Sequence, residues 1–383
     1  MADYFPIRAS VLKWACERVN LPFSELSKKY KCFSNEQNGL FKLTMKQLEN
    51  LSSKLRYPLF YLMLDSPVKE IDQLSISDFR TVNSNKIRPS INLKEEVDFC
   101  QSQQDWYSDF VRQNEIIPFE YINKFTLNDS PKSAGDKLRK YLNISYESAN
   151  NPNEYYKILK SIFEDHNILV NTSKVLKHTK NKLSVSEFRG FALTDKFAPL
   201  IFVNGNDSIN AQVFTLCHEL GHICLGISGV SDISSKNDFK SEKWCNEFAA
   251  NVLLPEKDIC KDFDNFADID VFLEKSVEKY HVSLNALLIR ILDLKLISKA
   301  DFEYYWEQAE IQYKNFLESA NKKKTKSGGS YYRTVNSRLS RLLTKSLIAA
   351  TSVGQTTYRE ATSLLGLKSV EVFCKFARQN GEQ

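Results

Sequence analysis

The pentapeptide His218-Glu219-Leu220-Gly221-His222 constrains the fold of this chain more than any other segment. In an α-helix, residues four positions apart lie one above the other on the same face. Apolar residues recur around the pentapeptide with helical spacing, which predicts a helix over about 208–226. On that helix, His218 and His222 could direct two imidazoles at one zinc ion, and Glu219 beside them could activate a water molecule.

A second segment offers the third protein ligand that a catalytic zinc site needs. Residues 241–254 also have a helical pattern, which Pro255 ends. Glu242 fits as the third ligand, and Glu247 is the rival candidate. Asn246, one turn after Glu242, could hydrogen-bond the far ring nitrogen of a ligand histidine and fix its tautomer. The alternative interpretation is a pair of amphipathic helices whose polar side chains are merely solvated.

The composition is that of an ordinary globular protein. The chain has 383 residues, 42% of them hydrophobic and 12% aromatic, which is enough for two or three folded domains. The first residues lack a basic stretch followed by an apolar core, and no apolar run reaches the length of a membrane span. Eight cysteines without regular spacing suit reduced thiols. We therefore expect a cytoplasmic protein with no membrane partner.

The charge is unevenly spread along the chain. Residues 1–60 carry a net charge of +5 and residues 321–383 carry +9, so residues 61–320 carry −9 of the total of +5. Basic ends around an acidic middle favour nucleic acid or an acidic protein as a partner at either end. The alternative is a solvated surface, which is the better interpretation of the run Lys322-Lys323-Lys324.

The order of the expected elements predicts an α+β protein of five segments. They are an N-terminal all-α domain (1–66), a helical connector (67–130), a mixed domain of small sheet and helices (131–265), a helical extension (266–320) and a basic helical C-terminal region (321–383). Further helices are expected at about 93–113, 132–143, 152–165 and within 267–320, and strands at 168–170, 187–193 and 200–203. A linker is expected at 324–330, and the turn near 364–367 is typical of helix-turn-helix units and of many packed helix pairs.

One expected strand is a candidate for contact with a peptide substrate. A strand that runs antiparallel to the site would bind an extended peptide by strand addition. Arg189, Gly190 and Phe191 are the candidates for this role. The alternative is that they belong to an internal strand of the sheet.

The two helical segments together resemble the ImmA/IrrE family of metallopeptidases. The resemblance rests on His218–His222 and on residues 242–250 with Leu253-Leu254-Pro255, and it extends to Arg189-Gly190-Phe191, Val203-Asn204 and Asn206-Asp207-Ser208. It implies a zincin-like domain with zinc on His218, His222 and Glu242 and with Glu219 as the catalytic base. Family members typically cleave a helix-turn-helix repressor. Longer fused forms resemble antitoxins of PIN-like ribonuclease toxins, which implies an alternative function of binding a partner without cutting it.

The N-terminal segment is similar to the Xre-type helix-turn-helix fused to such peptidases, but it departs from that pattern. Residues 31–39 are short for a recognition helix, Glu36 stands where tryptophan is expected, and Leu43-Thr44 stands in place of Pro-Thr. The side chains left to contact DNA or a protein partner are Asn35, Gln37, Asn38 and Lys42. Binding of a protein is therefore a serious rival to recognition of DNA.

A peptidase site also needs a group that stabilises the oxyanion of the transition state. The sequence singles out no residue for this role, and His281 and the tyrosines are candidates.

Overall fold

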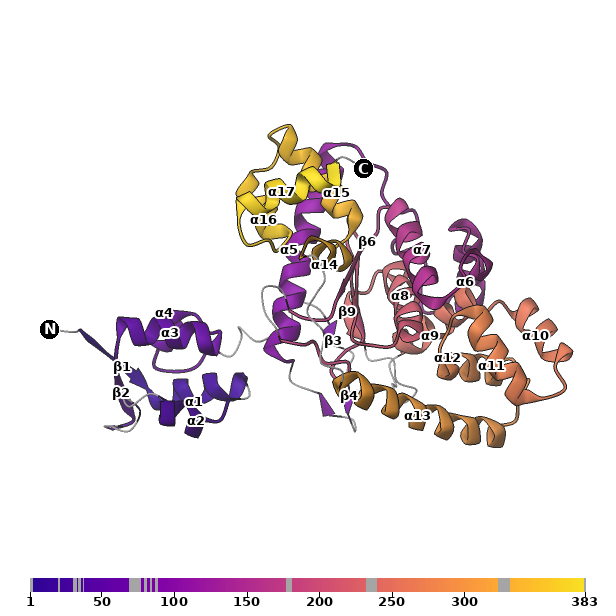
Figure 1. The fold of residues 1–383 in the computed structure, drawn as a ribbon, viewed down its shortest axis with the longest axis horizontal. Coiled ribbons are helices and arrows are strands. Elements are labelled where there is room, and N and C mark those ends of the chain that lie inside the picture. Colours follow the sequence, from indigo (N-terminus) through magenta and orange to yellow (C-terminus); the bar gives the residue numbers. More distant parts are fainter. Residues whose placement is uncertain are drawn as a thin grey trace. The chain divides into compact units, whose positions relative to one another are not determined.

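Figure 1 shows the computed structural model of the chain, which describes residues 3–381 apart from 20, 30–32, 34–35, 37, 69–76, 79–80, 83–84, 87–88, 177–180, 232–239 and 323–330. The chain divides into two compact units. One comprises Met1–Ser75 and Arg88–Val97, and the other comprises Ile76–Ile87 and Asp98–Gln383. The linker expected at 324–330 lies outside the described residues. Among those that are described, no helix combines the length and the apolar character needed to cross a membrane.

The N-terminal unit contains a two-stranded antiparallel sheet as well as helices. Its elements are β1 (Tyr4–Arg8), α1 (Ala9–Arg18), α2 (Phe23–Lys29), β2 (Leu40–Thr44), α3 (Met45–Leu55) and α4 (Leu59–Leu62). Thr44 and Gln47 form a capping box that begins α3. β1 and β2 pair antiparallel, so the prediction of an all-α domain is wrong. Phe41 and Leu43 are buried while Lys42 between them is exposed, which is the alternation of a strand.

This two-stranded sheet also changes the interpretation of the residues proposed to contact DNA or a partner. Asn38 lies in the turn before β2 with a left-handed φ of 52°, and Lys42 lies on β2 itself. Asn35 and Gln37 lie outside the described residues. Neither of the two described side chains is therefore on a recognition helix.

The second unit is built on a five-stranded sheet. The strand order is β3 (Ser77–Asp78), β9 (Gly229–Ser231), β7 (Gly190–Leu193), β8 (Leu200–Asn204) and β6 (Leu169–Ser173). β6 runs parallel to β8, whereas β7 runs antiparallel to both β8 and β9. Every residue of β7 and β8 is buried, which is typical of strands covered on both faces. The short β4 (Thr81–Val82) and β5 (Asn85–Lys86) form a separate pair.

One face of the sheet carries the helices of the candidate site. α8 (Ile209–Leu225) packs on β7 and β8, and α6 (Pro131–Tyr141), α7 (Pro152–Asp165) and α9 (Lys240–Leu253) pack around it (Figure 1). The same hydrophobic core continues from Phe119 to Ala309 through α10 (Glu256–Asn265), α11 (Ile269–Tyr280), α12 (Leu284–Asp293) and α13 (Lys299–Lys322). The sheet and the helices that follow it thus share one interior.

On the other face of the sheet, hydrogen bonds from buried amide side chains join the sheet to α5 and to the C-terminal segment. Gln104 on α5 (Ile91–Gln113) donates to the carbonyl oxygens of Leu193 and Ala198, 2.8 Å away in both cases. Asn171 on β6 donates to Gln103 at 2.7 Å and accepts from the backbone N–H of Ser340 at 2.9 Å. Ser340 directly precedes α15 (Arg341–Ser352), which α16 (Tyr358–Leu364) and α17 (Val370–Gly381) follow; α14 (Tyr331–Arg338) comes before it.

The architecture of the described residues is mixed α and β. The division of the chain into five segments, with the boundaries given above, stays a prediction.

Candidate metal centre

α8 is the central helix of the site and is buried after its first two residues. The Ser208 side chain caps its N-terminus by accepting from the backbone N–H of Ala211. Gly226 ends it in the left-handed conformation with a φ of 70°. All residues from 211 to 225 are buried. A helix that is covered on all sides carries the pentapeptide into the interior rather than to the surface.

α9 approaches α8 closely at Gly221. A Cβ atom at this position would lie 3.1 Å from Cys245 Sγ and 3.2 Å from Phe248 Cδ1, both on α9. The glycine therefore permits a short distance between the two helices. This packing places Glu242 and Asn246 of α9 against the histidines of α8. Cys217, Cys224 and Cys245 nearby are buried, and burial raises the pKa of all three thiols, so they serve packing in their protonated form.

Three side-chain groups converge between these helices. Nε2 of His218 lies 3.2 Å from Oε2 of Glu242, and Nε2 of His222 lies 3.0 Å from Oε1 of the same carboxylate. The two Nε2 atoms are 3.2 Å apart, and the three side chains are fully buried. A zinc ion bound tetrahedrally at about 2.0–2.2 Å would have ligand atoms roughly 3.3 Å apart. The cluster therefore has the donor set and the spacing of a zinc site.

The electrostatics of the cluster favour the protonation states that bind a metal. Burial lowers the pKa of His222, and this outweighs the raising effect of the Glu242 carboxylate. Burial alone would raise the pKa of Glu242, but hydrogen bonds and charge from His218 and His222 lower it to about 2. At neutral pH His222 is thus a neutral imidazole and Glu242 an ionised carboxylate, which are the ligand forms of both groups.

Asn246 orients His218. Its Oδ1 lies 2.9 Å from Nδ1 of the imidazole. Because an amide oxygen only accepts, Nδ1 of His218 carries the proton and donates it. The lone pair of Nε2 is then directed at the cluster, as expected for a ligand histidine whose far nitrogen is fixed by a second residue.

Glu219 is fully buried between α8 and β7. A Cβ atom at Gly190 would lie 2.9 Å from Oε1 of Glu219 and 2.6 Å from Cγ2 of Thr215. Only a glycine at this point of β7 leaves room for both side chains. The carboxylate next to His218 is therefore held against the central strand of the sheet.

The rival third ligand, Glu247, is not part of this cluster. Among the described histidine, cysteine and carboxylate side chains, the one group that could share a metal is His218, His222 and Glu242. Glu247 instead lines a cavity together with Asn251 and Arg290. It lies one residue after Asn246, and the helical rotation turns it away from the histidines.

The proposed substrate strand is internal, so its prediction as a surface for strand addition is wrong. Gly190 pairs with Val203 of β8 on one side and with Ser231 of β9 on the other. Phe191 is fully buried, and its ring stacks on Phe202 with a centroid distance of 4.8 Å. No edge of β7 is left for a peptide, because two neighbouring strands already satisfy its backbone groups.

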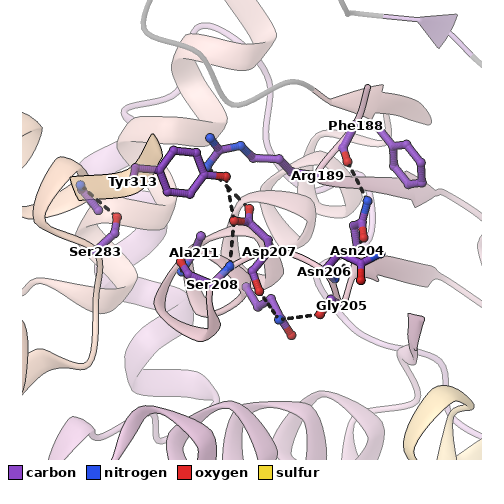
Figure 2. A network of polar contacts seen from close by, with 12 residues as sticks. Phe188, Arg189, Asn204, Gly205, Asn206, Asp207, Ser208, Ala211, Ser283 and Tyr313 are labelled. Carbon is purple, nitrogen blue, oxygen red and sulfur yellow. Dashed lines mark hydrogen bonds and ion pairs between the residues drawn. The ribbon is translucent and has the colours of Figure 1, made fainter. Parts of the chain in front are cut away.

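Arg189 has a structural partner instead (Figure 2). Its Nη1 lies 3.6 Å from Oδ2 of Asp207, and its guanidinium lies over the ring of Tyr313 at 5.2 Å. The Tyr313 hydroxyl donates to Oδ1 of Asp207 at 2.9 Å. Asp207 precedes the cap of α8, so this group of three fixes the start of the site helix. No sequence motif identifies Tyr313 as a partner of Asp207, because the two residues are 106 positions apart in the chain.

His281 is separate from the cluster. Its Nε2 lies 3.1 Å from the carbonyl oxygen of Ala149, and its ring packs against Tyr155 with a centroid distance of 5.4 Å. These contacts hold Nε2 and one face of the imidazole at the end of α11. No described contact joins it to His218, His222 or Glu242, so the structure does not support it as the oxyanion-stabilising residue.

A buried helix with His-Glu-x-x-His, completed by a carboxylate from a following helix, is the arrangement of zinc-dependent peptidases. Residues 163–292 match the family model described as the IrrE N-terminal-like domain, and this stretch contains the whole cluster. Residues 339–379 match a domain of unknown function (DUF8813). No curated protein and no solved structure matches the chain. The first match supports the metallopeptidase part of the resemblance, and neither match covers the N-terminal unit, whose similarity to Xre domains stays a prediction.

Proposed function

We propose that the chain is a zinc-dependent endopeptidase that hydrolyses a peptide bond in a regulatory protein. The observation that carries the proposal is the convergence of His218, His222 and Glu242 at 3.0–3.2 Å, with Glu219 beside them. A structural zinc site has no need of a second buried carboxylate next to its three ligands, whereas a hydrolase needs a general base there.

The residues have separate roles in this mechanism. Zinc held by His218, His222 and Glu242 would supply a Lewis acid for the scissile carbonyl and lower the pKa of water. Glu219 accepts the proton of the attacking water and later passes it to the leaving amine. Asn246 positions His218 through its Nδ1 proton. The close approach of the Glu219 carboxylate to Gly190 of β7 fixes its position beside the metal ligands.

The substrate we expect is a protein of the kind that the family cleaves, such as a repressor. The seven described cysteines are free, which supports a reducing compartment such as the cytoplasm. The four site residues are fully buried, so a substrate chain reaches them only after local opening of the fold.

That burial also favours a second candidate function. A protein of the antitoxin kind would bind a PIN-like ribonuclease toxin through its surface, and it would need no access to the metal centre. The closed site suits a structural zinc in such a binder. This function leaves Glu219 without a role, which is why we rank it second.

Metal content and one substitution separate the two functions. Elemental analysis should find one zinc per chain in the wild type and none in His218→Ala. Glu219→Gln should retain zinc and lose cleavage of the partner by about 10²–10⁴-fold, the usual contribution of a general base. Unchanged cleavage in Glu219→Gln would sink the peptidase proposal, and a stable partner complex without cleavage in the wild type would favour the binder.

A further inference from the structure

A cavity of about 410 Å³ lies on the side of α9 that faces away from the metal cluster. Its walls come from the start of α6, the second half of α9, the start of α10 and the end of α12. The volume is within the range of small-molecule sites. Arg290, Asn251, Glu247 and Asp293 line it and bring both signs of charge into one space.

Arg290 provides a buried positive group with spare hydrogen-bonding capacity. The residue is 4% exposed, and its Nε donates to the carbonyl oxygen of Leu254 at 3.1 Å. Its Nη2 has no hydrogen-bond partner, and the guanidinium forms no ion pair among the described residues, although the charges of Glu256, Asp293 and Asp136 act on it. A guanidinium keeps its charge at any physiological pH, so an unmatched donor in the interior is costly. The group that best matches it is a carboxylate.

Asn251 adds an unmatched acceptor to the same cavity. It is 3% exposed, and its Nδ2 donates to the backbone carbonyl of Glu247 at 2.7 Å. Its Oδ1 has no partner. An amide oxygen in this position calls for a donor from a ligand.

Two carboxylates form the negative part of the lining. Glu247 is half-buried, and burial together with the charge of Asp293 raises its pKa. Neither carboxylate takes part in an ion pair among the described residues, although the charge of Lys243 acts on both. Glu256 in the same wall is neutralised by Lys132. A positively charged ligand group between Glu247 and Asp293 would relieve their mutual repulsion.

We propose that this cavity binds a zwitterion that carries an α-ammonium and a carboxylate, either a free amino acid or a short peptide. The carboxylate pairs with Arg290, and the ammonium lies among Glu247, Asp293 and Oδ1 of Asn251. A simple anion would meet the two carboxylates, and a simple cation would meet the guanidinium and, at the rim, Lys295. The proposal does not rest on the proposed peptidase activity, because none of the cavity residues is a metal ligand or the general base.

The test is titration calorimetry on the full chain with four matched probes: L-alanine, L-alanyl-L-alanine, its N-acetyl form and its C-terminal amide. A thermal-shift panel of the 20 free amino acids precedes it. At least one free zwitterion should bind, and each blocked dipeptide should bind about tenfold more weakly or worse than the free one, because blocking leaves a charged group unmatched. Binding of the dipeptide alone identifies a peptide ligand, and binding of amino acids alone identifies a free amino acid. Blocked forms that bind as tightly as the free one, or no binding by any probe up to about 10 mM, would overturn the proposal.

Substitutions assign the two ends of the ligand. Arg290→Gln should weaken the free dipeptide about tenfold and should remove the difference between it and the amide. Because Arg290 also contacts Leu254, the double variant Glu247→Gln/Asp293→Asn provides a second measurement, in which free and N-acetylated dipeptide should bind alike. Lys257→Gln, an exposed position on α10 outside the cavity lining, is the matched control and should bind as the wild type does. Wild-type binding in the double variant would refute the assignment of the ammonium.

Discussion

Gly190 is the position at which the smallest change should disturb the site most. The Cβ of an alanine there would lie 2.6 Å from Cγ2 of Thr215, 2.9 Å from Oε1 of Glu219 and 2.9 Å from the carbonyl oxygen of Phe202. Contacts this short cannot persist, and the Phe202 oxygen belongs to the backbone of the adjacent strand. Glu219 is the side chain with most freedom to move, so the substitution should displace the catalytic base.

The cost of Gly190→Ala can be worked out from these contacts. Overpacking a buried position costs about 1–3 kcal/mol, and a backbone contact puts this position at about 2–3 kcal/mol. Removing a glycine from a strand returns about 0.5–1 kcal/mol, so the net loss of unfolding free energy should be about 1–2.5 kcal/mol. In a unit of this size that lowers Tm by roughly 2–10 °C.

The assay is thermal unfolding followed by circular dichroism, together with zinc content and partner cleavage. Zinc should be retained, because the atoms nearest to a Cβ at Gly190 belong to Thr215, Glu219 and Phe202 and not to the metal ligands. Cleavage should fall as it does in Glu219→Gln. Adding Thr215→Ser removes the methyl group behind the shortest contact and should restore part of the lost Tm. A Gly190→Ala chain with the wild-type Tm and full activity would refute the packing of β7 against α8.

Three further outcomes follow from the site. Asn246→Ala should weaken zinc binding about 10–100-fold in a competition with a chelator, as loss of an orienting partner usually does; unchanged affinity would deny its positioning role. Because burial lowers the pKa of His222, zinc should stay bound as the pH falls through about 6.5, the ordinary histidine value, and should leave only below it. Release of zinc above that pH, measured by elemental analysis after dialysis, would contradict a lowered pKa of His222. Tyr313→Phe removes the hydrogen bond to Asp207 and should cost about 0.5–1.5 kcal/mol in thermal unfolding, whereas Tyr304→Phe, at 62% exposure, should cost nothing measurable.

The parts of this fold that the sequence predicts well are those fixed by local periodicity. The spacing of His218 and His222 places both on one face of a single helix wherever that helix lies. The spacing of Glu242 and Asn246 does the same for α9, and the structure brings the two faces together. The helices expected at 208–226 and 241–254 end within a few residues of α8 and α9.

The errors arise where the answer depends on distant partners. The position of Arg189–Phe191 in the sheet is decided by β9, a strand of only three residues, and by β8 on the other side. The β1–β2 sheet has no local signal in the sequence, because each strand has only five residues and two helices separate them. The partner of Asp207 lies on α13, and no periodicity near Asp207 indicates that helix.

α9 connects the metal cluster with the zwitterion cavity, so their ligands should influence each other. Glu242 and Asn246 occupy one face of this helix, and Glu247 and Asn251 the other. A ligand held by Glu247 restrains the same turn that carries Asn246, and coupling between two sites typically changes affinity by about 5–150-fold. L-alanyl-L-alanine should therefore shift zinc affinity in a chelator competition, and by reciprocity zinc should shift the affinity for the dipeptide by the same factor. The shift should disappear in Glu247→Gln/Asp293→Asn. If the dipeptide binds and the zinc affinity does not change, α9 does not transmit an effect from the cavity to the metal cluster, and the two sites bind their ligands independently.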